Sequence, residues 1–335
     1  MSVAVPSAAP RVFVSRPVFP EVLDYLGKHL EVAVNPGAEA LPPDALAAAV
    51  ADREGLLLSG FDPFRAELVA RCPRLRAVCN IAVGFNNIDV AACTEAGIRV
   101  TNTPDVVDDS TADLAWALIL AAGRQVVAWD RWLRAGNWQD TARNPVRGLD
   151  IHHATLGILG LGRVGRAIAA RAAGFSMQVV YHNRRRLAPQ DEAATGARWL
   201  PRDELLRASD FLVLALPYTP ENRHALGAAE LALMKPTACL INVARGGIVD
   251  DRALVAALRE KRLAGAGLDV FENEPALDPG FLDLDNVVLT PHIGTATRAT
   301  RVAMALRAAE NLVAAMQGHR PRDLVNPEVE SRLRA

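Results

Sequence analysis

The sequence predicts an α/β protein built on parallel sheets whose two faces are both covered by helices. Short runs that are apolar throughout alternate with helical stretches along most of the chain, which is typical of such sheets. Half of the 335 residues are hydrophobic, which suffices for real cores and excludes a globally disordered chain. The length indicates two domains, because one domain usually holds about 100–200 residues.

The first alternating series begins at Arg11 and ends near Pro104, and it predicts one α/β unit. Helices are expected at Glu21–Leu30 and Asp44–Asp52. The expected strands are Val12–Ser15, Glu31–Val34, Gly55–Ser59, Leu75–Asn80 and Ile98–Asn102. These elements alternate regularly, so the strands should form one parallel sheet between two layers of helices.

A long helical stretch follows at Ser110–Ala135. Ser110 can serve as its N-cap, with Asp113 three residues later as in a capping box. Its longest apolar run, Leu114–Ala122, has nine residues and is expected to be buried. A membrane span needs about 20 apolar residues, so no span is expected. The loop Gly136–Asp150, rich in Gly, Asn, Arg and Pro, then leads to a second series.

The second series predicts a doubly wound sheet of six strands joined by helical connections. The expected strands are Leu156–Gly160, Gln178–His182, Phe211–Leu216, Ala238–Val243, Gly265–Val270 and Val287–Thr290. A last helix is expected at Ala296–Gln317. Its apolar positions are spaced 4, 3, 4 and 3 residues apart, which places Val302, Leu306, Ala309, Val313 and Met316 on one face.

A complete G-x-G-x-x-G motif stands at the first turn of this second series, in Gly160-Leu161-Gly162-Arg163-Val164-Gly165. The motif follows an apolar strand and opens the expected helix Arg163–Ala173, which is the context of a dinucleotide-binding turn. The first glycine permits the tight turn, the second lets a pyrophosphate approach the backbone, and the third lets helix and strand pack closely. The pyrophosphate would then bind the free N–H groups at the helix start.

The end of the next strand favours NADP(H) over NAD(H). Proteins that bind NAD carry an acidic residue about 20 positions after the glycines. This sequence has Asn183-Arg184-Arg185-Arg186 there instead. Guanidinium groups bind a 2′-phosphate through charge-assisted bonds, so NADP(H) is the preferred cofactor and NAD(H) remains possible. The alternative is a solvated basic loop.

Three polar residues follow three consecutive late strands: Arg245, Glu274 and His292. The carboxyl ends of parallel strands lie at one edge of the sheet, where ligands bind. An arginine can hold a carboxylate, a histidine can protonate a developing alkoxide, and a neighbouring carboxylate favours the imidazolium. Each residue alone would be read as a surface or capping residue, but all three in this order, behind an intact dinucleotide motif, are hard to attribute to chance.

These motifs resemble those of the D-isomer-specific 2-hydroxyacid dehydrogenases, and within them the glyoxylate/hydroxypyruvate reductases, including the branch that reduces 2-ketogluconate. The resemblance extends from about Val12 to Pro327. The matching stretches are Ala82–Asp89, Ile151–Gly157, Gly160–Gly165, Asn183–Arg185, Asn242–Gly247, Gly267–Pro275 and Pro291–Gly294.

The resemblance implies two Rossmann-like domains that are nested in the chain. Residues 1–104 and 296–335 would form a flavodoxin-like substrate domain, and residues 105–295 the NAD(P)-binding Rossmann domain. A homodimer built largely on the long helix is also implied, while the reduced cysteines indicate a cytoplasmic location. Trp138 could then reach the active site of the neighbouring subunit.

The resemblance further implies a role for individual residues. Arg245 would bind the substrate carboxylate, Glu274 would orient His292 and raise its pKa, and His292 would donate the proton while NADPH delivers hydride. Other residues on the substrate side would be Ser59, Gly60, Val83 and Gly84. Further contacts to the cofactor would come from Pro217, Asn222, Val243, Ala244, Asp269 and Gly294.

Composition limits the other functions. The net charge of −1 argues against nucleic-acid partners and gives no electrostatic reason to bind an anionic membrane. Four cysteines without a C-x-x-C pair suit reduced thiols and no metal site. Met1–Pro10 lacks the features of a secretory signal. Two alternatives stay open: a phosphoglycerate dehydrogenase-like NAD enzyme, and a non-catalytic dinucleotide-sensing protein that resembles the corepressors of this fold.

Overall fold

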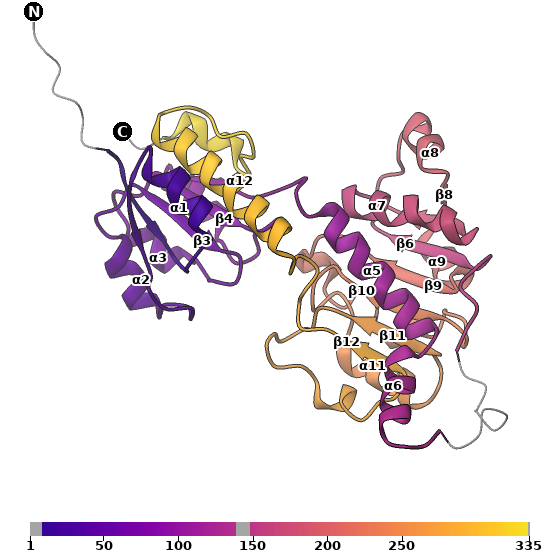
Figure 1. The fold of residues 1–335 in the computed structure, drawn as a ribbon. Coiled ribbons are helices and arrows are strands. Elements are labelled where there is room, and N and C mark those ends of the chain that lie inside the picture. Colours follow the sequence, from indigo (N-terminus) through magenta and orange to yellow (C-terminus); the bar gives the residue numbers. More distant parts are fainter. Residues whose placement is uncertain (1–8, 139–147, 334–335) are drawn as a thin grey trace, which may run out of the picture. The chain divides into compact units, whose positions relative to one another are not determined.

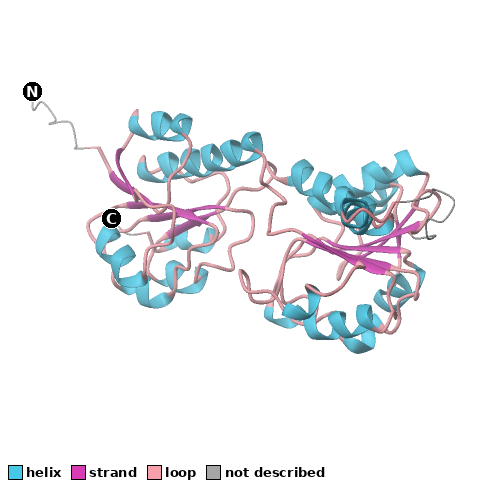
Figure 2. Ribbon diagram, turned by 60° about the horizontal axis from the view of Figure 1, so that its bottom comes forward, coloured by secondary structure: helices cyan, strands magenta, loops and turns pink. Residues whose placement is uncertain are grey.

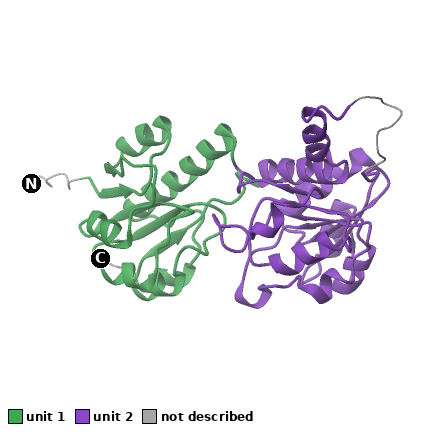
Figure 3. Ribbon diagram, turned by 90° about the horizontal axis from the view of Figure 1, so that it is seen from below, with its two compact units in different colours: residues 1–107, 296–335 green, residues 108–295 purple. Residues whose placement is uncertain are grey.

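The structure, a computed structural model, describes residues 9–138 and 148–333. Within the predicted segments Met1–Pro10 and Gly136–Asp150, residues 1–8 and 139–147 lie outside the described part. The chain forms two compact units (Figure 3). Unit 1 consists of Met1–Val107 and Ala296–Ala335, and unit 2 is Asp108–Thr295.

Unit 1 is built on a parallel five-stranded sheet with the order β2-β1-β3-β4-β5. This 2-1-3-4-5 order is that of flavodoxin-like folds, so the predicted fold of this unit is confirmed. The strands are β1 (Arg11–Val14), β2 (Glu31–Val34), β3 (Gly55–Ser59), β4 (Ala77–Ile81) and β5 (Arg99–Thr101). The helices are α1 (Pro20–Gly27), α2 (Pro43–Val50), α3 (Ala66–Ala70), α4 (Val90–Glu95), α12 (Arg298–Met316) and the 3₁₀ turn η5 (Pro327–Ser331).

Helix α12 returns to unit 1 and packs against β3, β4 and α1 (Figure 1). Thr297 caps its N-terminus by accepting a hydrogen bond from the N–H of Thr300. The predicted apolar face is partly wrong, because Val302 and Leu306 are only half-buried. The buried face is centred instead on Met304, Ala305, Ala308, Ala309, Leu312, Val313, Ala315 and Met316. Small alanines on this face let the helix lie close to the sheet. The buried face is therefore turned about the helix axis relative to the predicted face, which periodicity alone could not reveal.

Unit 2 is built on a parallel seven-stranded sheet with the order β12-β11-β10-β9-β6-β7-β8. Counted from β6, this is the 3-2-1-4-5-6 order of a dinucleotide-binding fold, with β12 added as a seventh strand beside β11. The sequence predicts every strand of this sheet except β8. The strands are β6 (Thr155–Leu159), β7 (Gln178–His182), β8 (Arg198–Trp199), β9 (Phe211–Leu214), β10 (Cys239–Asn242), β11 (Gly265–Leu268) and β12 (Val287–Leu289).

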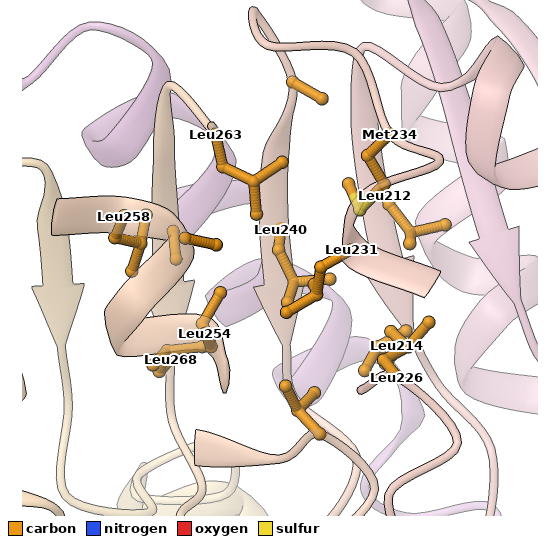
Figure 4. Close-up of a cluster of buried hydrophobic side chains, with 14 of the residues drawn as sticks. Leu212, Leu214, Leu226, Leu231, Met234, Leu240, Leu254, Leu258, Leu263 and Leu268 are labelled. Atoms are coloured by element: carbon orange, nitrogen blue, oxygen red, sulfur yellow. The ribbon is translucent and has the colours of Figure 1, made fainter. Parts of the chain in front are cut away.

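Helices cover both faces of this sheet (Figure 2). The helices of unit 2 are α5 (Asp108–Gly123), α6 (Val126–Arg134), α7 (Arg163–Ala172), α8 (Pro189–Thr195), α9 (Arg202–Ala208), α10 (Ala228–Leu231) and α11 (Asp251–Arg259). The 3₁₀ turns are η2 (Ala173–Phe175), η3 (Pro220–Asn222) and η4 (Pro279–Phe281). On one face, leucines of β9, β10 and β11 pack against α10 and α11 (Figure 4). The opposite face packs against α5 and α7.

The single long helix predicted at Ser110–Ala135 is wrong. Two helices, α5 and α6, replace it, and they meet at an angle of 59°. Gln125 adopts a left-handed conformation at the break, with a φ of 51°. Ser110 is not the N-cap either, because α5 begins at Asp108 and the Ser110 hydroxyl donates to the carbonyl of Gly294 at 2.8 Å.

No single helix in the described residues has the length and hydropathy of a membrane span; α5 and α6 reach them only as a bent pair. Most of the apolar run in α5 is buried against the sheet, as the sequence predicts. The four cysteines, Cys72, Cys79, Cys93 and Cys239, are buried, and none of them forms a disulfide with another described residue. Burial raises the pKa of Cys79 and of Cys239 to about 12, so neither is a reactive thiolate.

Candidate active site

The glycine-rich turn between β6 and α7 has the geometry that its sequence motif predicts. Gly160 has a φ of 105°, and a Cβ atom there would lie 2.7 Å from the backbone carbonyl of Ala215. A Cβ on Gly165 would lie 2.3 Å from the carbonyl oxygen of Gly160. Around Gly162, in contrast, a Cβ would meet nothing within 4 Å, and no side chain caps the start of α7. The turn is therefore tight on its protein side and open where a pyrophosphate would approach.

The three consecutive arginines after β7 differ in their contacts with the rest of the protein. Arg186 forms contacts within the protein. Its guanidinium donates to both carboxylate oxygens of Glu192 at 2.7 Å and lies 5.8 Å from the ring centroid of Trp199. The hydrogen bonds from Arg186 are the largest cause of a low Glu192 pKa of about 2. Arg184 and Arg185 are exposed, and neither forms an ion pair or side-chain hydrogen bond with any described residue.

Asn183 has a structural task at the same strand end. Its side-chain oxygen accepts a hydrogen bond from the backbone N–H of Leu161 at 2.7 Å, which ties β7 to the glycine-rich turn. Arg163, inside the motif, forms an ion pair with Asp108 at 3.6 Å. The carboxylate that binds ribose hydroxyl groups in NAD-specific proteins has no counterpart at position 183, because Asn183 is a neutral amide.

The loop after β9 carries two of the residues expected at the cofactor, Pro217 and Asn222. Asn222 closes this loop on itself: its oxygen accepts from the N–H of Thr219 at 2.8 Å, and its amide nitrogen donates to the carbonyl of Pro217 at 2.6 Å. Asn222 therefore shapes the loop, and its side-chain atoms are bound within it.

Arg245 stands in the turn after β10, which the buried Asn242 shapes. The Asn242 oxygen accepts from the N–H of Ala244 at 3.1 Å, and its nitrogen donates to the carbonyl of Arg245 at 3.3 Å. The Arg245 side chain is half-buried and donates to the carbonyl of Ala244 at 2.7 Å. Burial lowers the pKa of Arg245, and the nearby Glu274 carboxylate partly offsets that effect. A partly desolvated cation of this kind suits an anionic ligand.

Glu274 and His292 form a direct pair. One carboxylate oxygen of Glu274 lies 2.7 Å from Nδ1 of His292, and the other accepts from the N–H of Phe271 at 2.9 Å. Burial acts to raise the pKa of Glu274, but the hydrogen bonds and the charges of His292 and Arg245 outweigh it, so the net pKa is lowered. Glu274 is therefore held as a carboxylate beside the imidazole. These interactions bring all three predicted catalytic residues together within unit 2.

Asp269 holds the backbone of the loop that carries His292, a role that the sequence does not reveal. His292 has a φ of 53°, which lies in the left-handed region that residues other than glycine rarely adopt. The buried Asp269 carboxylate accepts from the hydroxyl of Thr290 at 2.7 Å and from the N–H groups of Ile293 and Gly294 at 2.8 and 2.9 Å. Gly294, expected at the cofactor, thus lies within hydrogen-bond distance of Asp269.

The expected substrate-side residues belong to unit 1 and follow two neighbouring strands. Ser59, the last residue of β3, pairs in register with Ile81, the last residue of β4. A Cβ on Gly60 would lie 2.5 Å from the Cβ of Ala82, so the two loops touch. The structure therefore brings Ser59 and Gly60 beside the loop of Val83 and Gly84.

Comparisons with known proteins agree on one family. A family profile described as "D-isomer specific 2-hydroxyacid dehydrogenase, NAD binding domain" matches residues 116–294. The chain is 45% identical to a glyoxylate reductase of Thermococcus gammatolerans over 324 residues, which is 96% of this chain and 97% of that protein. It is 47% identical to a glyoxylate reductase of Aeropyrum pernix over 326 residues, again 96% of this chain and 97% of the other.

A solved structure with a similar fold is that of an NADPH-dependent glyoxylate/hydroxypyruvate reductase from Sinorhizobium meliloti, in complex with NADP and malonate. The two chains superpose with a TM-score of 0.87 at 35% sequence identity, and the match covers 98% of this chain and 100% of that one.

Proposed function

The chain belongs to the D-isomer-specific 2-hydroxyacid dehydrogenases, and from this premise we propose that it reduces a small 2-ketoacid to the D-2-hydroxyacid with NADPH. The proposed substrates are glyoxylate, hydroxypyruvate and 2-ketogluconate. Enzymes of this family depend on NAD(P), and the glyoxylate reductases matched over nearly the whole chain support the first two substrates. The single observation that carries the proposal is the 2.7 Å pair between Glu274 and His292 beside the half-buried Arg245.

In the proposed mechanism, Arg245 binds the carboxylate of the ketoacid, since a guanidinium matches a carboxylate in both charge and geometry. His292 donates a proton to the ketone oxygen as that oxygen gains charge. Because Nδ1 of His292 faces Glu274, the donating atom is Nε2. Glu274 fixes the ring orientation and stabilises the imidazolium before the transfer. A reduced nicotinamide, when bound, supplies the hydride to the carbonyl carbon.

The proposed preference for NADPH is supported by the strand end after β7. Asn183 cannot act as the acidic acceptor for a ribose 2′-hydroxyl, and Arg184 and Arg185 are exposed at the next two positions. Arg186 is bound to Glu192, so we assign the 2′-phosphate to Arg184 and Arg185 alone. The NADP in the Sinorhizobium meliloti structure is consistent with this assignment.

Three further proposals concern the surroundings of the reaction. The loops of Ser59–Gly60 and Val83–Gly84 form the substrate side, where backbone N–H groups add to the binding of the carboxylate. A homodimer forms through the α5–α6 region, where α6 buries none of its residues and exposes Val126 and Leu133. Trp138, which is 57% exposed beyond α6, then reaches the neighbouring subunit. The cytoplasm is the proposed location.

The experiment that tests the proposal measures oxidation of NADPH by the purified protein with five ketoacids: glyoxylate, hydroxypyruvate, pyruvate, phenylpyruvate and 2-ketogluconate. We expect turnover with the small or sugar-derived ketoacids and a higher kcat/KM with NADPH than with NADH. Binding of NADPH without turnover on any ketoacid would contradict the proposal and favour a dinucleotide-sensing protein. A clear preference for NADH would refute only the assignment of the arginines.

A further inference from the structure

Three consecutive carbonyl groups after β4 all point back into the body of unit 1. Each accepts a hydrogen bond from a different donor at 2.8–3.0 Å. The bonds run from the N–H of Thr103 to the carbonyl of Ala82, from the side-chain amide of Asn102 to that of Val83, and from the side-chain amide of Asn80 to that of Gly84. Two of the three donors are therefore asparagine side chains.

The direction of these carbonyls determines the direction of the N–H groups that follow them. A trans peptide is planar and places the carbonyl of one residue and the N–H of the next on opposite sides. The only cis peptide in the described residues is Glu274–Pro275, so the three peptides here are trans. The N–H groups of Val83, Gly84 and Phe85 must then point away from the body of the unit. Within the described chain, none of the three donates a hydrogen bond.

Asn80 is itself fixed by a second asparagine. Its amide nitrogen lies 3.2 Å from the side-chain oxygen of Asn87, and the Asn87 nitrogen lies 3.1 Å from the Asn80 oxygen, so the two amides bond reciprocally. The Asn87 nitrogen also donates to the carbonyl of Asp62 at 2.9 Å. Asn80 is fully buried. Its rotamer is thus set by contacts on both loops of the substrate side.

Asn102 is anchored through its backbone. Its backbone N–H donates to the carbonyl of Asp323 at 3.3 Å, and its own carbonyl accepts from the side chain of Asn311 on α12 at 3.4 Å. The donor to Val83 is therefore anchored by the C-terminal part of the chain.

We propose that Asn80 and Asn102 are positioning residues for the proposed reaction, because they turn the peptides of Val83 and Gly84 so that three successive N–H groups face the substrate carboxylate. Adjacent backbone N–H groups that point the same way form a good binding site for an anion. The inference rests on the proposed function and extends it, since it names the side chains that prepare the anion site. Neither asparagine touches the substrate itself.

The test compares Asn80→Ala and Asn102→Ala with Asn326→Ala as the matched control. Asn326 is also a fully buried asparagine of unit 1 with three side-chain hydrogen bonds, to Val100, Thr94 and Ile98. All three variants should unfold at lower temperature than the wild type. Asn80→Ala and Asn102→Ala should raise the KM for glyoxylate by about tenfold or more, which corresponds to about 1.4 kcal/mol, while the KM for NADPH stays within about twofold. Asn326→Ala should leave both KM values unchanged.

Binding of oxamate, a non-reacting analogue with a carboxylate, provides a measurement that does not require turnover. Calorimetry on the protein saturated with NADPH should show the same loss of affinity in Asn80→Ala and Asn102→Ala. Unchanged KM and oxamate affinity in a folded Asn102→Ala protein would overturn the inference, whether or not Asn80→Ala folds. Absence of turnover and of oxamate binding in the wild type would instead refute the proposed function.

Discussion

Replacement of Asp251 by Asn tests the electrostatics of the loop that ends at Glu274. Asp251 is the first residue of α11 and is only 7% exposed. Its carboxylate accepts one hydrogen bond, from the N–H of Glu272 at 3.0 Å. Burial, together with the charges of Glu272, Asp278 and Asp250, raises the pKa of Asp251 from 3.8 to about 6, although the hydrogen bond from Glu272 acts in the opposite direction.

The sign of the effect follows from the two pKa values. The folded protein holds the proton of Asp251 more tightly than the unfolded chain, so stability is lost as the pH rises from about 4 to about 6. Above that range the cost is constant. The two pKa values, about 6 in the folded protein and 3.8 in the unfolded chain, differ by about 2.2 units. At about 1.36 kcal/mol for each pKa unit, the free energy of unfolding is lowered by about 3 kcal/mol above about pH 6. A neutral asparagine at this position avoids that cost and can still accept from Glu272.

The assay is urea unfolding of the wild type and of Asp251→Asn at pH 4 and pH 8, followed by tryptophan fluorescence. This signal reports on unit 2 alone, which contains all five tryptophans: Trp116, Trp129, Trp132, Trp138 and Trp199. At pH 4 the carboxyl of the unfolded chain is already more than half ionised, so relative to the wild type the variant should gain about 2.4 kcal/mol between the two pH values. Any pH-independent cost of the new amide cancels in that comparison. Asp283→Asn, at an exposed position, controls for the loss of one charge. A stability difference that does not change with pH would refute the reasoning.

Three further outcomes are expected. His292→Asn should lower kcat for ketoacid reduction by about 10²–10⁴-fold with little change in the KM for NADPH. Near-wild-type turnover of this variant would disprove the role of His292 as the proton donor. The double variant Arg184→Ser/Arg185→Ser should raise the KM for NADPH by about tenfold or more and leave that for NADH unchanged, as measured by steady-state kinetics against the wild type. Gly246→Ala should lower the free energy of unfolding by about 1–3 kcal/mol in the urea assay, because its Cβ would lie 1.7 Å from the carbonyl oxygen of Phe271; equal stability would contradict the observed contact.

Most of the fold could be predicted from the sequence because buried parallel strands are apolar throughout and therefore easy to recognise. The short strand β8, Arg198–Trp199, was missed because two residues carry no periodicity. The bend after α5 was also missed. Gly123 there packs against Phe211, and the left-handed conformation at Gln125 has no signature in the residue itself. Propensity extends a helix through such a point, whereas tertiary packing ends it.

The candidate site was only partly predictable for a similar reason. Glycine spacing and strand ends locate the turn of Gly160 and the trio Arg245, Glu274 and His292, because these signals are local in the chain. The partners of Arg186 and the bonds that Asp269 makes to the His292 loop depend on residues brought together by folding. No local sequence pattern predicts these contacts, so they can be identified only from the side-chain distances in the structure.

The most direct measurement of the central claim uses hydroxypyruvate, whose reduction creates a stereocentre. Wild-type protein is incubated with NADPH and hydroxypyruvate, and the configuration of the glycerate is determined by chiral chromatography against both enantiomers. Our account predicts NADPH oxidation matched by an equal amount of D-glycerate. The formation of L-glycerate, or no glycerate at all from folded protein that binds NADPH, would contradict it.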